Sequence, residues 1–426
     1  MWWFYYTFWS LFQTTWKTTT KMSFFIKIDN LKFKISKTLA TSLRATKNPI
    51  QSQILNNEFI FNINSINLFQ ELTSTPKCFY VTLSKKKHRI SRKFYEYLEK
   101  RLDSQNRKLF LVDLCSGTGS ALLASLKYSQ IIHTFSNDFC MQSKKIFLAN
   151  FDSDAFNSLD LCKINSKDVP IHDILISGFP CQPFSIAGNR QGFADSRAQI
   201  FWDLIRIIKC RTPRFVILEN VKNLRAVNKG QTLNLIIKNL ESLGYHVKIQ
   251  VLDVAKITDI PQHRERLFIF CFRNERDFKE LDLNFSPVQN KNIIEFFETS
   301  VEKKYYISEN SATFKKINSL ITNHYTTGSL YQYRRSEIRE YKNKSPTLLA
   351  NMGTGGHNVP LIRDSFGIRK LTPRECFRLQ GFPDSYSLNC SDSALYKLCG
   401  NAICVKVLDL LFERICCLIN NTSAFN

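Results

Sequence analysis

The sequence has no long hydrophobic run and no secretory signal pattern. Of its 426 residues, 44% are hydrophobic and 22% are charged, yet apolar stretches such as LFLVDL and RLFIFCF are short. A helix needs about 20 consecutive apolar residues to cross a bilayer. The composition therefore argues against a membrane protein or membrane partner, and it favours a globular chain that buries a substantial core.

Paired cysteines are also missing. The thirteen cysteines are an odd number, and none of them forms a C-x-x-C pair. This pattern argues against a disulfide framework and against a zinc site, so we expect no metal. We expect a reducing, intracellular compartment, which the bacterial cytoplasm and nucleoid or an organelle would provide, with the nucleus left open.

Acidic residues are scarce compared with basic ones. The chain has 59 Lys and Arg against 36 Asp and Glu, a net charge of +23. Residues 1–105 hold 17 basic and 6 acidic residues, a surplus of 11, which leaves 23 − 11 = 12 for the remainder. Such a charge favours a nucleic acid as partner, and a basic solubility tail is the alternative.

Residues 1–105 differ in composition from the rest of the chain. They open with the aromatic cluster MWWFYYTFWSLF and then become rich in Lys, Ser, Thr, Asn and Ile. The stretch after Met22 resembles an organelle targeting segment, but low-complexity coding from an AT-rich gene gives a similar mixture. We treat residues 1–105 as a basic N-terminal extension. Whether it targets an organelle, binds DNA or is largely untranslated stays open, and so does the question of whether Met22 is the true start.

Apolar strand patterns alternate with helical patterns from Leu109 onward. This alternation predicts an α/β fold with a mostly parallel sheet and helices on both faces. The predicted strands are LFLVDL, HTFSND, HDILISGFP, RFVILEN, YHVKIQVLDV and ERLFIFCF, and the clearest helices are ALLASLKYS, QIFWDLIRIIK and TLNLIIKNLESLG.

The predicted strands end in residues that can do chemistry. Asp113, Asp138, Cys181 and Glu219 each lie at or just after a strand's carboxyl end, where ligands bind in parallel sheets. Glycines in DLCSGTGS allow a tight turn and close approach of a ligand to the backbone. An acid such as Asp138, one strand further on, is placed to meet ribose hydroxyls.

Cys181 lies in the stiff segment SGFPCQPFSIAG. A single cysteine is usually an inert, buried side chain, so a catalytic interpretation depends on other functional residues that could act with it. Such residues are Glu219 in ENV and the arginines Arg264 and Arg266 in QHRERLFIF. A thiol can add to an electron-poor ring while the acid protonates a ring nitrogen and the arginines position the acid and hydrogen-bond a ring oxygen.

Residues 286–364 interrupt the alternation. They are rich in Asn, Lys, Tyr and Ser and contain the basic YRRSEIREYKNK and the glycine-rich NMGTGGHN. Beyond them, RKLTPRECFRLQGFP predicts a capped helix, with Thr372 before Pro373 at the first helical position.

Six motifs in order carry a family resemblance: DLCSGTGS, SGFPCQPFSIAG, ENVKNL, QHRERLFIF, RKLTPRECFRLQGFPDSY and CGNAICVKVLDLL. The chain resembles a DNA (cytosine-5) methyltransferase of the compact bacterial, type II modification methylase kind. The resemblance implies a Rossmann-like, S-adenosylmethionine-dependent methyltransferase fold, with a mixed, mainly parallel sheet and a small target-recognition lobe. It divides the chain into a catalytic lobe (106–285), a target-recognition region (286–364) and a segment that completes the catalytic lobe (365–420).

The resemblance also implies roles for the catalytic residues. Cys181 would add to C6 of a cytosine that is flipped out of the duplex, because C6 lies inside the base stack. Glu219 would hold and protonate N3, with Arg264 and Arg266 in support. The methyl group would come from S-adenosyl-L-methionine and be transferred to C5.

The residues expected to bind S-adenosylmethionine are implied by the same motifs. Asp138 would bind the ribose, Phe139 would lie beside the adenine, and Asp160 would be near its amine. Three positions depart from the family pattern: Cys115 replaces a usual Phe, Ser120 a usual Gly, and Asp138 a usual Glu. The full expected set is Asp113, Cys115, Gly117, Gly119, Asp138, Phe139, Asp160, Leu161, Pro180, Asn401 and Ala402.

The expected partner is double-stranded DNA, read by residues 286–364 through base edges and phosphates. A variable surface insertion without readout is the alternative for that region. We expect a monomer, with a cognate restriction endonuclease as a further partner. Two other functions remain: a tRNA cytosine-5 methyltransferase, and a catalytically inactive DNA-binding homologue. GFPCQPFS and the size of the recognition segment favour DNA.

Overall fold

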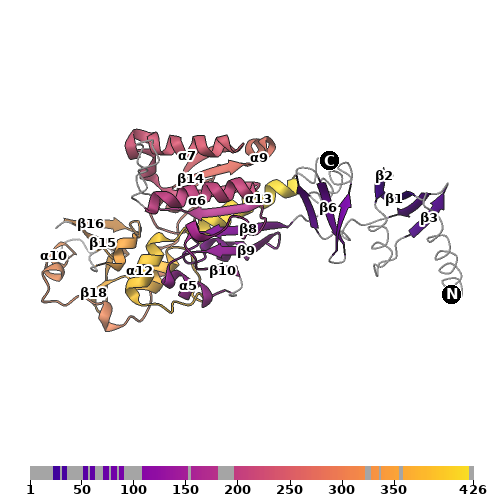
Figure 1. Ribbon diagram of the computed structural model, residues 1–426. Coiled ribbons are helices and arrows are strands. Elements are labelled where there is room, and N and C mark those ends of the chain that lie inside the picture. Colours follow the sequence, from indigo (N-terminus) through magenta and orange to yellow (C-terminus); the bar gives the residue numbers. More distant parts are fainter. Residues whose placement is uncertain are drawn as a thin grey trace, which may run out of the picture. The chain divides into compact units, whose positions relative to one another are not determined.

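The computed structural model of the 426-residue chain is shown in Figure 1. It describes residues 108–151, 155–180, 196–321, 328–334, 337–354 and 358–421, together with seven strands between Ser23 and Ile90. Lys108–Leu418 form one compact unit, and the seven strands belong to another. Within the described ranges, no helix combines the length and the apolar character that crossing a membrane requires.

A seven-stranded sheet organises the larger unit. Its order is β10-β9-β8-β11-β12-β14-β13, in which the first five strands are parallel and β14 runs antiparallel to both of its neighbours. The mixed, mainly parallel sheet predicted from the sequence is confirmed; the two-residue strand β10 was not predicted. The bounds are β8 Leu109–Leu114, β9 Ile131–Asn137, β10 Phe156–Asn157, β11 Ile174–Gly178, β12 Phe215–Val221, β13 His246–Asp253 and β14 Glu265–Phe272.

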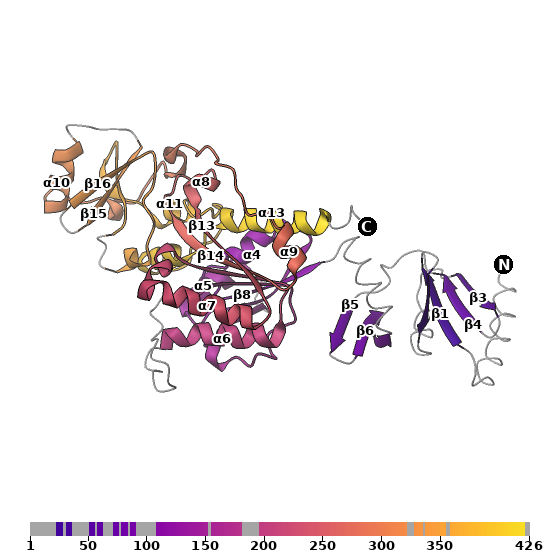
Figure 2. The same ribbon diagram turned by 90° about the horizontal axis from the view of Figure 1, so that it is seen from above.

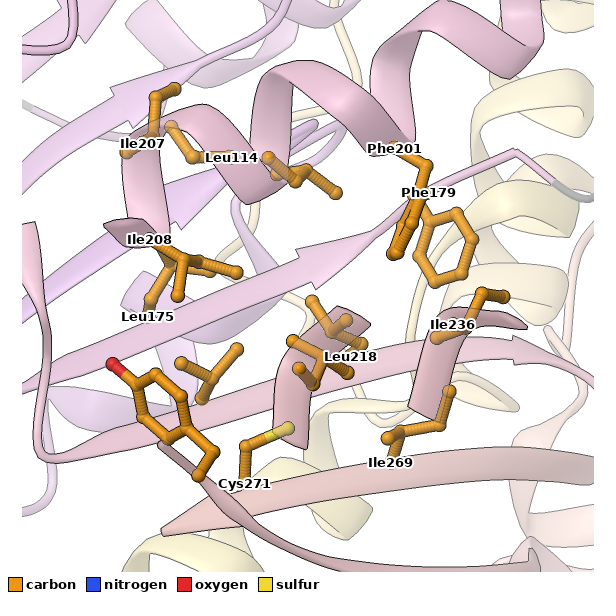
Figure 3. Close-up of a cluster of buried hydrophobic side chains, with 14 of the residues drawn as sticks. Leu114, Leu175, Phe179, Phe201, Ile207, Ile208, Leu218, Ile236, Ile269 and Cys271 are labelled. Carbon is orange, nitrogen blue, oxygen red and sulfur yellow. The ribbon is translucent and has the colours of Figure 1, made fainter. Parts of the chain in front are cut away.

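Helices cover both faces of this sheet. Helices α6 (Ser196–Arg211) and α7 (Gln231–Ser242) lie on one side, and α13 (Val405–Asn421) lies on the other (Figure 2). Both faces are therefore buried, which explains why the strands read as nearly continuous apolar runs. The core beneath α6 and α7 includes Leu114, Leu175, Phe179, Phe201, Ile207, Ile208, Leu218, Ile236, Ile269 and Cys271 (Figure 3).

Shorter elements connect the strands. The remaining α-helices are α4 Ser120–Ser125, α5 Met141–Leu148, α8 Val254–Ile257, α9 Glu275–Glu280, α10 Ala312–Ile321, α11 Pro373–Arg378 and α12 Asp392–Asn401. The 3₁₀ turns are η3 Leu161–Lys163, η4 Lys222–Arg225, η5 Val227–Gly230, η6 Ile293–Phe296, η7 Lys303–Tyr305 and η8 Ala350–Gly353.

A second, antiparallel sheet forms where the sequence pattern was interrupted. Its order is β16-β15-β17-β18, with β15 Ser329–Arg334, β16 Glu337–Lys342, β17 Leu361–Asp364 and β18 Gly367–Lys370. A small core of Ile317, Tyr331, Leu361 and Ile368 joins it to α10. The β17–β18 hairpin straddles residue 364, where the sequence placed the end of the recognition region.

The strands before Lys108 form two further sheets, which the composition of residues 1–105 does not predict. The first has the order β2-β1-β4-β3, with β1 and β4 parallel, and the second is the antiparallel β5-β6-β7. Their bounds are β1 Ser23–Ile28, β2 Leu31–Ile35, β3 Gln51–Leu55, β4 Glu58–Asn62, β5 Glu71–Thr75, β6 Cys78–Leu83 and β7 Lys86–Ile90.

A buried ion pair anchors the chain where it leaves the second sheet. Arg369 on β18 is 1% exposed and Glu375 on α11 is 0% exposed, and two guanidinium nitrogens lie 2.8 Å from the carboxylate oxygens. Thr372 caps α11 in a full capping box, with Pro373 at the helix start as the sequence predicted. The carboxylate of Glu375 also accepts a hydrogen bond from the backbone N–H of Glu298.

Replacing Glu375 should show how much this anchor contributes. We expect Glu375→Gln to lower the free energy of unfolding by about 1.5–3 kcal/mol, because Arg369 loses its fully buried counter-charge and keeps only the partly exposed Asp364, 2.7 Å from its Nε. The control is Glu280→Gln, which breaks an exposed pair with Arg276 on α9 and should cost about 0.5 kcal/mol at most. Urea unfolding of both variants gives the comparison, and equal losses would contradict the role of the anchor.

Candidate active site

A cavity of about 930 Å³ opens at the carboxyl ends of β8, β9, β11 and β12. Parallel strands bring their carboxyl ends to one edge, so residues far apart in sequence meet there. Among the predicted site residues, Gly119, Asp160 and Leu161 do not line this cavity, and Cys181 lies outside the described residues. The predicted residues that line it are Asp113, Cys115, Gly117, Asp138, Phe139, Pro180, Glu219, Arg264, Arg266, Asn401 and Ala402.

The pairing of β11 with β12 places Glu219 opposite Gly178, three residues before Cys181. The side chain of Asn220 then ties the two segments together. Its amide nitrogen donates to the carbonyl oxygen of Phe179 over 2.9 Å, and its amide oxygen accepts from the N–H of Val221 over 2.8 Å. Asn220 thus positions the backbone that leads into the cysteine segment, a role that the sequence analysis missed.

Glu219 and Arg266 form an ion pair inside the cavity. The guanidinium Nε lies 3.1 Å from a carboxylate oxygen, and Glu219 is only 8% exposed. Burial raises the pKa of Glu219 above its ordinary value, while the charges of Arg266 and Arg264 act against that rise. A carboxyl group with a raised pKa can carry a proton near neutral pH and donate it to a ring nitrogen.

Arg264 is held differently from Arg266. Its guanidinium donates to three backbone carbonyl oxygens: Leu348 at 2.8 Å, Gly400 at 3.0 Å and Ala402 at 2.8 Å. Burial, followed by the charge of Arg266, lowers the pKa of Arg264 to about 9. The side chain therefore joins the segment around Leu348 to the end of α12.

The glycine turn after β8 is built around Asp138. The two carboxylate oxygens accept hydrogen bonds from the N–H groups of Gly117 and Cys140, each over 2.8 Å. Gly117 and Gly119 have φ angles of +54° and +71°, in the left-handed region where glycine has no steric penalty. A Cβ on Gly117 would meet nothing within 4 Å, whereas one on Gly119 would lie 2.6 Å from the Phe151 ring. Gly117 thus leaves room for a ligand, and Gly119 leaves room for Phe151.

The first strand ends in two groups with raised pKa values. Burial, and then the charge of Asp138, raise the pKa of Asp113. The same two causes raise the pKa of the Cys115 thiol to about 12, so this thiol stays neutral. Cys115 also has a φ of +56°, which is uncommon for a residue with a side chain.

Only some of the residues predicted to contact the adenine line the cavity. Phe139 is 64% exposed and lines it, so its ring is available for stacking. Asp160 caps the η3 turn by accepting from the N–H of Cys162, and Leu161 is buried in the core beneath α6 and α7. Together, Asp138 at a strand end, the open space at Gly117 and the free face of Phe139 fit an adenosine-containing cofactor.

Helix α12 supplies a wall that the sequence analysis found only in part. Ser393, Lys397 and Asn401 recur every four residues along it and all line the cavity. Such spacing puts side chains on one helix face, so the polar repeat was a signal present in the sequence. In the described part of the chain, no group of three or more His, Cys, Asp or Glu residues is arranged to hold a metal ion.

A seven-stranded sheet with an antiparallel β14 and a cofactor-sized cavity at the strand ends is the fold of S-adenosylmethionine-dependent methyltransferases. Residues 109–417 match the family model described as C-5 cytosine-specific DNA methylase. The chain therefore belongs to this family. It is a DNA (cytosine-5) methyltransferase of the compact bacterial type II kind, and it uses S-adenosylmethionine as methyl donor.

Curated relatives support this family, and solved structures share the fold. The chain is 38% identical to the type II methyltransferase M.Bsp6I of Bacillus sp. (strain RFL6), covering 72% of this chain and 98% of the relative. It is 31% identical to the type II methyltransferase M.HhaI of Haemophilus parahaemolyticus, over 74% of this chain and 96% of the relative. The Dnmt2 methyltransferase structure of S. pombe (20% identity, TM-score 0.55) covers 72% of this chain and 98% of that chain. The structure of a Spodoptera frugiperda DNMT2 mutant (18% identity, TM-score 0.59) likewise shares the fold, and the match covers 72% of this chain and 99% of that chain.

The two turn glycines should respond differently to alanine. We expect Gly119→Ala to lower the free energy of unfolding by about 2–5 kcal/mol, from left-handed strain of about 1–2 kcal/mol plus crowding of about 1–3 kcal/mol against Phe151. Gly117→Ala should lower the free energy of unfolding only by the strain contribution. It should weaken S-adenosylmethionine binding about tenfold or more, because the alanine methyl group enters the open space. Urea unfolding and titration calorimetry test both, and the reverse pattern would contradict the assignment.

Proposed function

We propose that Cys181 and Glu219 methylate a flipped cytosine of duplex DNA through a covalent intermediate. One observation carries the proposal: a buried Glu219–Arg266 pair lines the cavity, and strand pairing sets Glu219 opposite Gly178, three residues before Cys181. The position of Cys181 in GFPCQPFS supports its role, although the residue itself lies outside the described ranges.

In the first step the Cys181 thiolate forms a bond to C6 of the cytosine, and Glu219 donates a proton to N3. The ring electrons then make C5 a nucleophile. S-adenosylmethionine, when bound, supplies the methyl group that C5 takes. Loss of the C5 proton to water, return of the N3 proton to Glu219 and departure of the Cys181 sulfur as a thiolate then restore the ring. Arg266 holds the Glu219 carboxyl in place and offers donors to the base oxygen, with Arg264 in support.

For the cofactor, we propose that Asp138 and Asp113 hold polar groups and that Phe139 and Pro180 contact the adenine and the reacting centre. The lining of the cavity by these residues supports this assignment. Asp160 and the backbone at Leu161 would reach the adenine edge from beside the cavity. The remaining proposed residues are Cys115, Gly117 and Gly119 in the turn, and Asn401 and Ala402 at the end of α12.

We propose that residues 286–364 read the target sequence, within lobes bounded as the sequence predicts (1–105, 106–285, 286–364, 365–420). The separate sheet β16-β15-β17-β18 supports a distinct recognition lobe. The enzyme would act as a monomer in a reducing compartment, bacterial or organellar, alongside a cognate restriction endonuclease. The eleven cysteines in the described ranges are all free, which agrees with such a compartment.

Transfer of labelled methyl groups to duplex DNA and to tRNA, measured side by side, tests the substrate. Incorporation into DNA alone is the expected result. Incorporation into tRNA alone would indicate the RNA-modifying alternative, and DNA binding without incorporation into either would indicate an inactive homologue. Bisulfite sequencing of DNA from expressing cells then gives the recognised site.

Cys181→Ser should abolish turnover. We expect the rate to fall at least about 1000-fold, because a neutral hydroxyl replaces the thiolate nucleophile. Duplex DNA with 5-fluorocytosine at the target tests the covalent step: fluorine at C5 blocks proton loss, so the wild-type enzyme should stay attached after denaturation and the variant should not. Cys210→Ser on α6 is the control and should keep both properties, since Cys210 is exposed and does not line the cavity. A covalent complex with Cys181→Ser would contradict the assignment.

Glu219→Gln should remove the proton donor while leaving DNA binding intact. We expect kcat to fall by about 100- to 10,000-fold, the range for a lost general acid. In the wild-type enzyme, kcat should fall as pH rises through the raised Glu219 pKa, because the protonated form is the donor. This alkaline decline should be absent in Glu219→Gln. An unchanged pH profile of kcat in the variant would exclude Glu219 as the acid.

A further inference from the structure

The two arginines of the RER sequence have different surroundings. Arg266 directs its Nε at the carboxylate of Glu219, within reach of the base that Glu219 would hold. Arg264 is 1% exposed, and its two terminal nitrogens are taken up by backbone carbonyl oxygens. Its Nε is buried and has no partner in the described part of the chain. The terminal nitrogens of Arg264 are thus anchored by the backbone, whereas Arg266 is anchored by the carboxylate of Glu219.

The carbonyls that Arg264 binds belong to two distant segments. One is Leu348, two residues before the η8 turn of the proposed recognition region. The others are Gly400 and Ala402, which flank Asn401 at the end of α12. The guanidinium of Arg264, which lies just before β14, therefore links the proposed recognition region to the C-terminal end of α12. We call this end of α12 the cofactor wall.

Glycines let these two segments meet closely. A Cβ on Gly400 would lie 2.2 Å from the backbone nitrogen of Ala350, and one on Gly353 would lie 2.3 Å from the carbonyl oxygen of Ser393. The η8 turn and α12 are thus in backbone contact at two points. Arg264 binds carbonyls on both sides of this contact. Loss of its side chain would leave the two segments packed together, but their position relative to the cavity would no longer be fixed.

Burying a guanidinium without a carboxylate partner is costly. Arg264 has only carbonyl oxygens as hydrogen-bond acceptors. Burial and the nearby charge of Arg266 oppose its charge more strongly than the charge of Glu219 favours it. A hydrophobic side chain of similar length would fill the same space without this cost. The retained charge is explained if several directional hydrogen bonds are needed at this junction, since an arginine offers five donors in a fixed plane.

We propose that Arg264 is a positioning residue that couples the recognition region to the cofactor wall and does not contact the target base. This inference rests on the proposed roles of Asn401, Ala402 and residues 286–364. It predicts that Arg264 controls S-adenosylmethionine affinity even when no DNA is present, whereas Arg266 acts only once a cytosine occupies the cavity.

The experiment compares Arg264→Met, Arg264→Lys and Arg266→Met, with Arg276→Met on α9 as the control for losing an arginine at a remote, exposed position. Calorimetry gives the S-adenosylmethionine Kd without DNA, and steady-state kinetics give kcat and KM for duplex DNA. Because a hydrogen bond to a charged group contributes about 1.5–3 kcal/mol, we expect Arg264→Met to raise the Kd at least about tenfold. Arg264→Lys, which keeps the charge and some of the bonds, should lie between it and the wild type.

Arg266→Met should leave the Kd within about twofold and reduce kcat, the mark of an interaction made in the transition state. If both Arg264 variants bind S-adenosylmethionine as the wild type does and lose only kcat, the proposal is overturned and Arg264 contacts the base. If Arg264→Met does not fold, Arg264→Lys decides by the same Kd criterion. The Kd needs no turnover, so this result is independent of whether Cys181 is the nucleophile.

Discussion

The parallel pairing of β11 with β12 is the constraint on which the site depends. It sets Glu219 opposite Gly178, and Asn220 then bonds to the carbonyl of Phe179. A slip of one residue would turn Glu219 toward the core beneath α6 and α7, because successive side chains of a strand face opposite sides. A slip would also break the bond from Asn220 to Phe179 and leave a buried amide without its partner.

Charged groups are buried where distant parts of the chain meet. Arg369 and Glu375 join the second sheet to α11, and Arg264 joins η8 to the end of α12. The Glu219–Arg266 pair lies instead at the cavity, where burial raises the pKa of the carboxyl group, as the proposed proton donation requires. Two of these groups join parts of the architecture, and the third is the one to which we assign a chemical role.

Elements with a strong apolar pattern were predictable, and the others were not. The strands β8, β9, β11, β12, β13 and β14 are all predicted by apolar runs, and α11 by its cap and proline. The small sheet of β15 to β18 was missed because β16, with the sequence EIREYK, lies largely in solvent and carries no apolar period. The seven strands between Ser23 and Ile90 were missed because the composition of that segment resembles low complexity.

The family and its reaction class could be predicted from the sequence alone. The order of the motifs identifies the family, and a thiol, an acid and two arginines near strand ends suggested the roles proposed for Cys181, Glu219, Arg264 and Arg266. Only the tertiary structure separates Arg264 from Arg266, because the Arg264 partners are carbonyls 84, 136 and 138 residues further along the chain. It likewise shows Asp138 bonded to the glycine turn and Asn220 holding the approach to Cys181. Backbone carbonyls and amides are the same at every position, so no sequence pattern reveals which of them a side chain will bind.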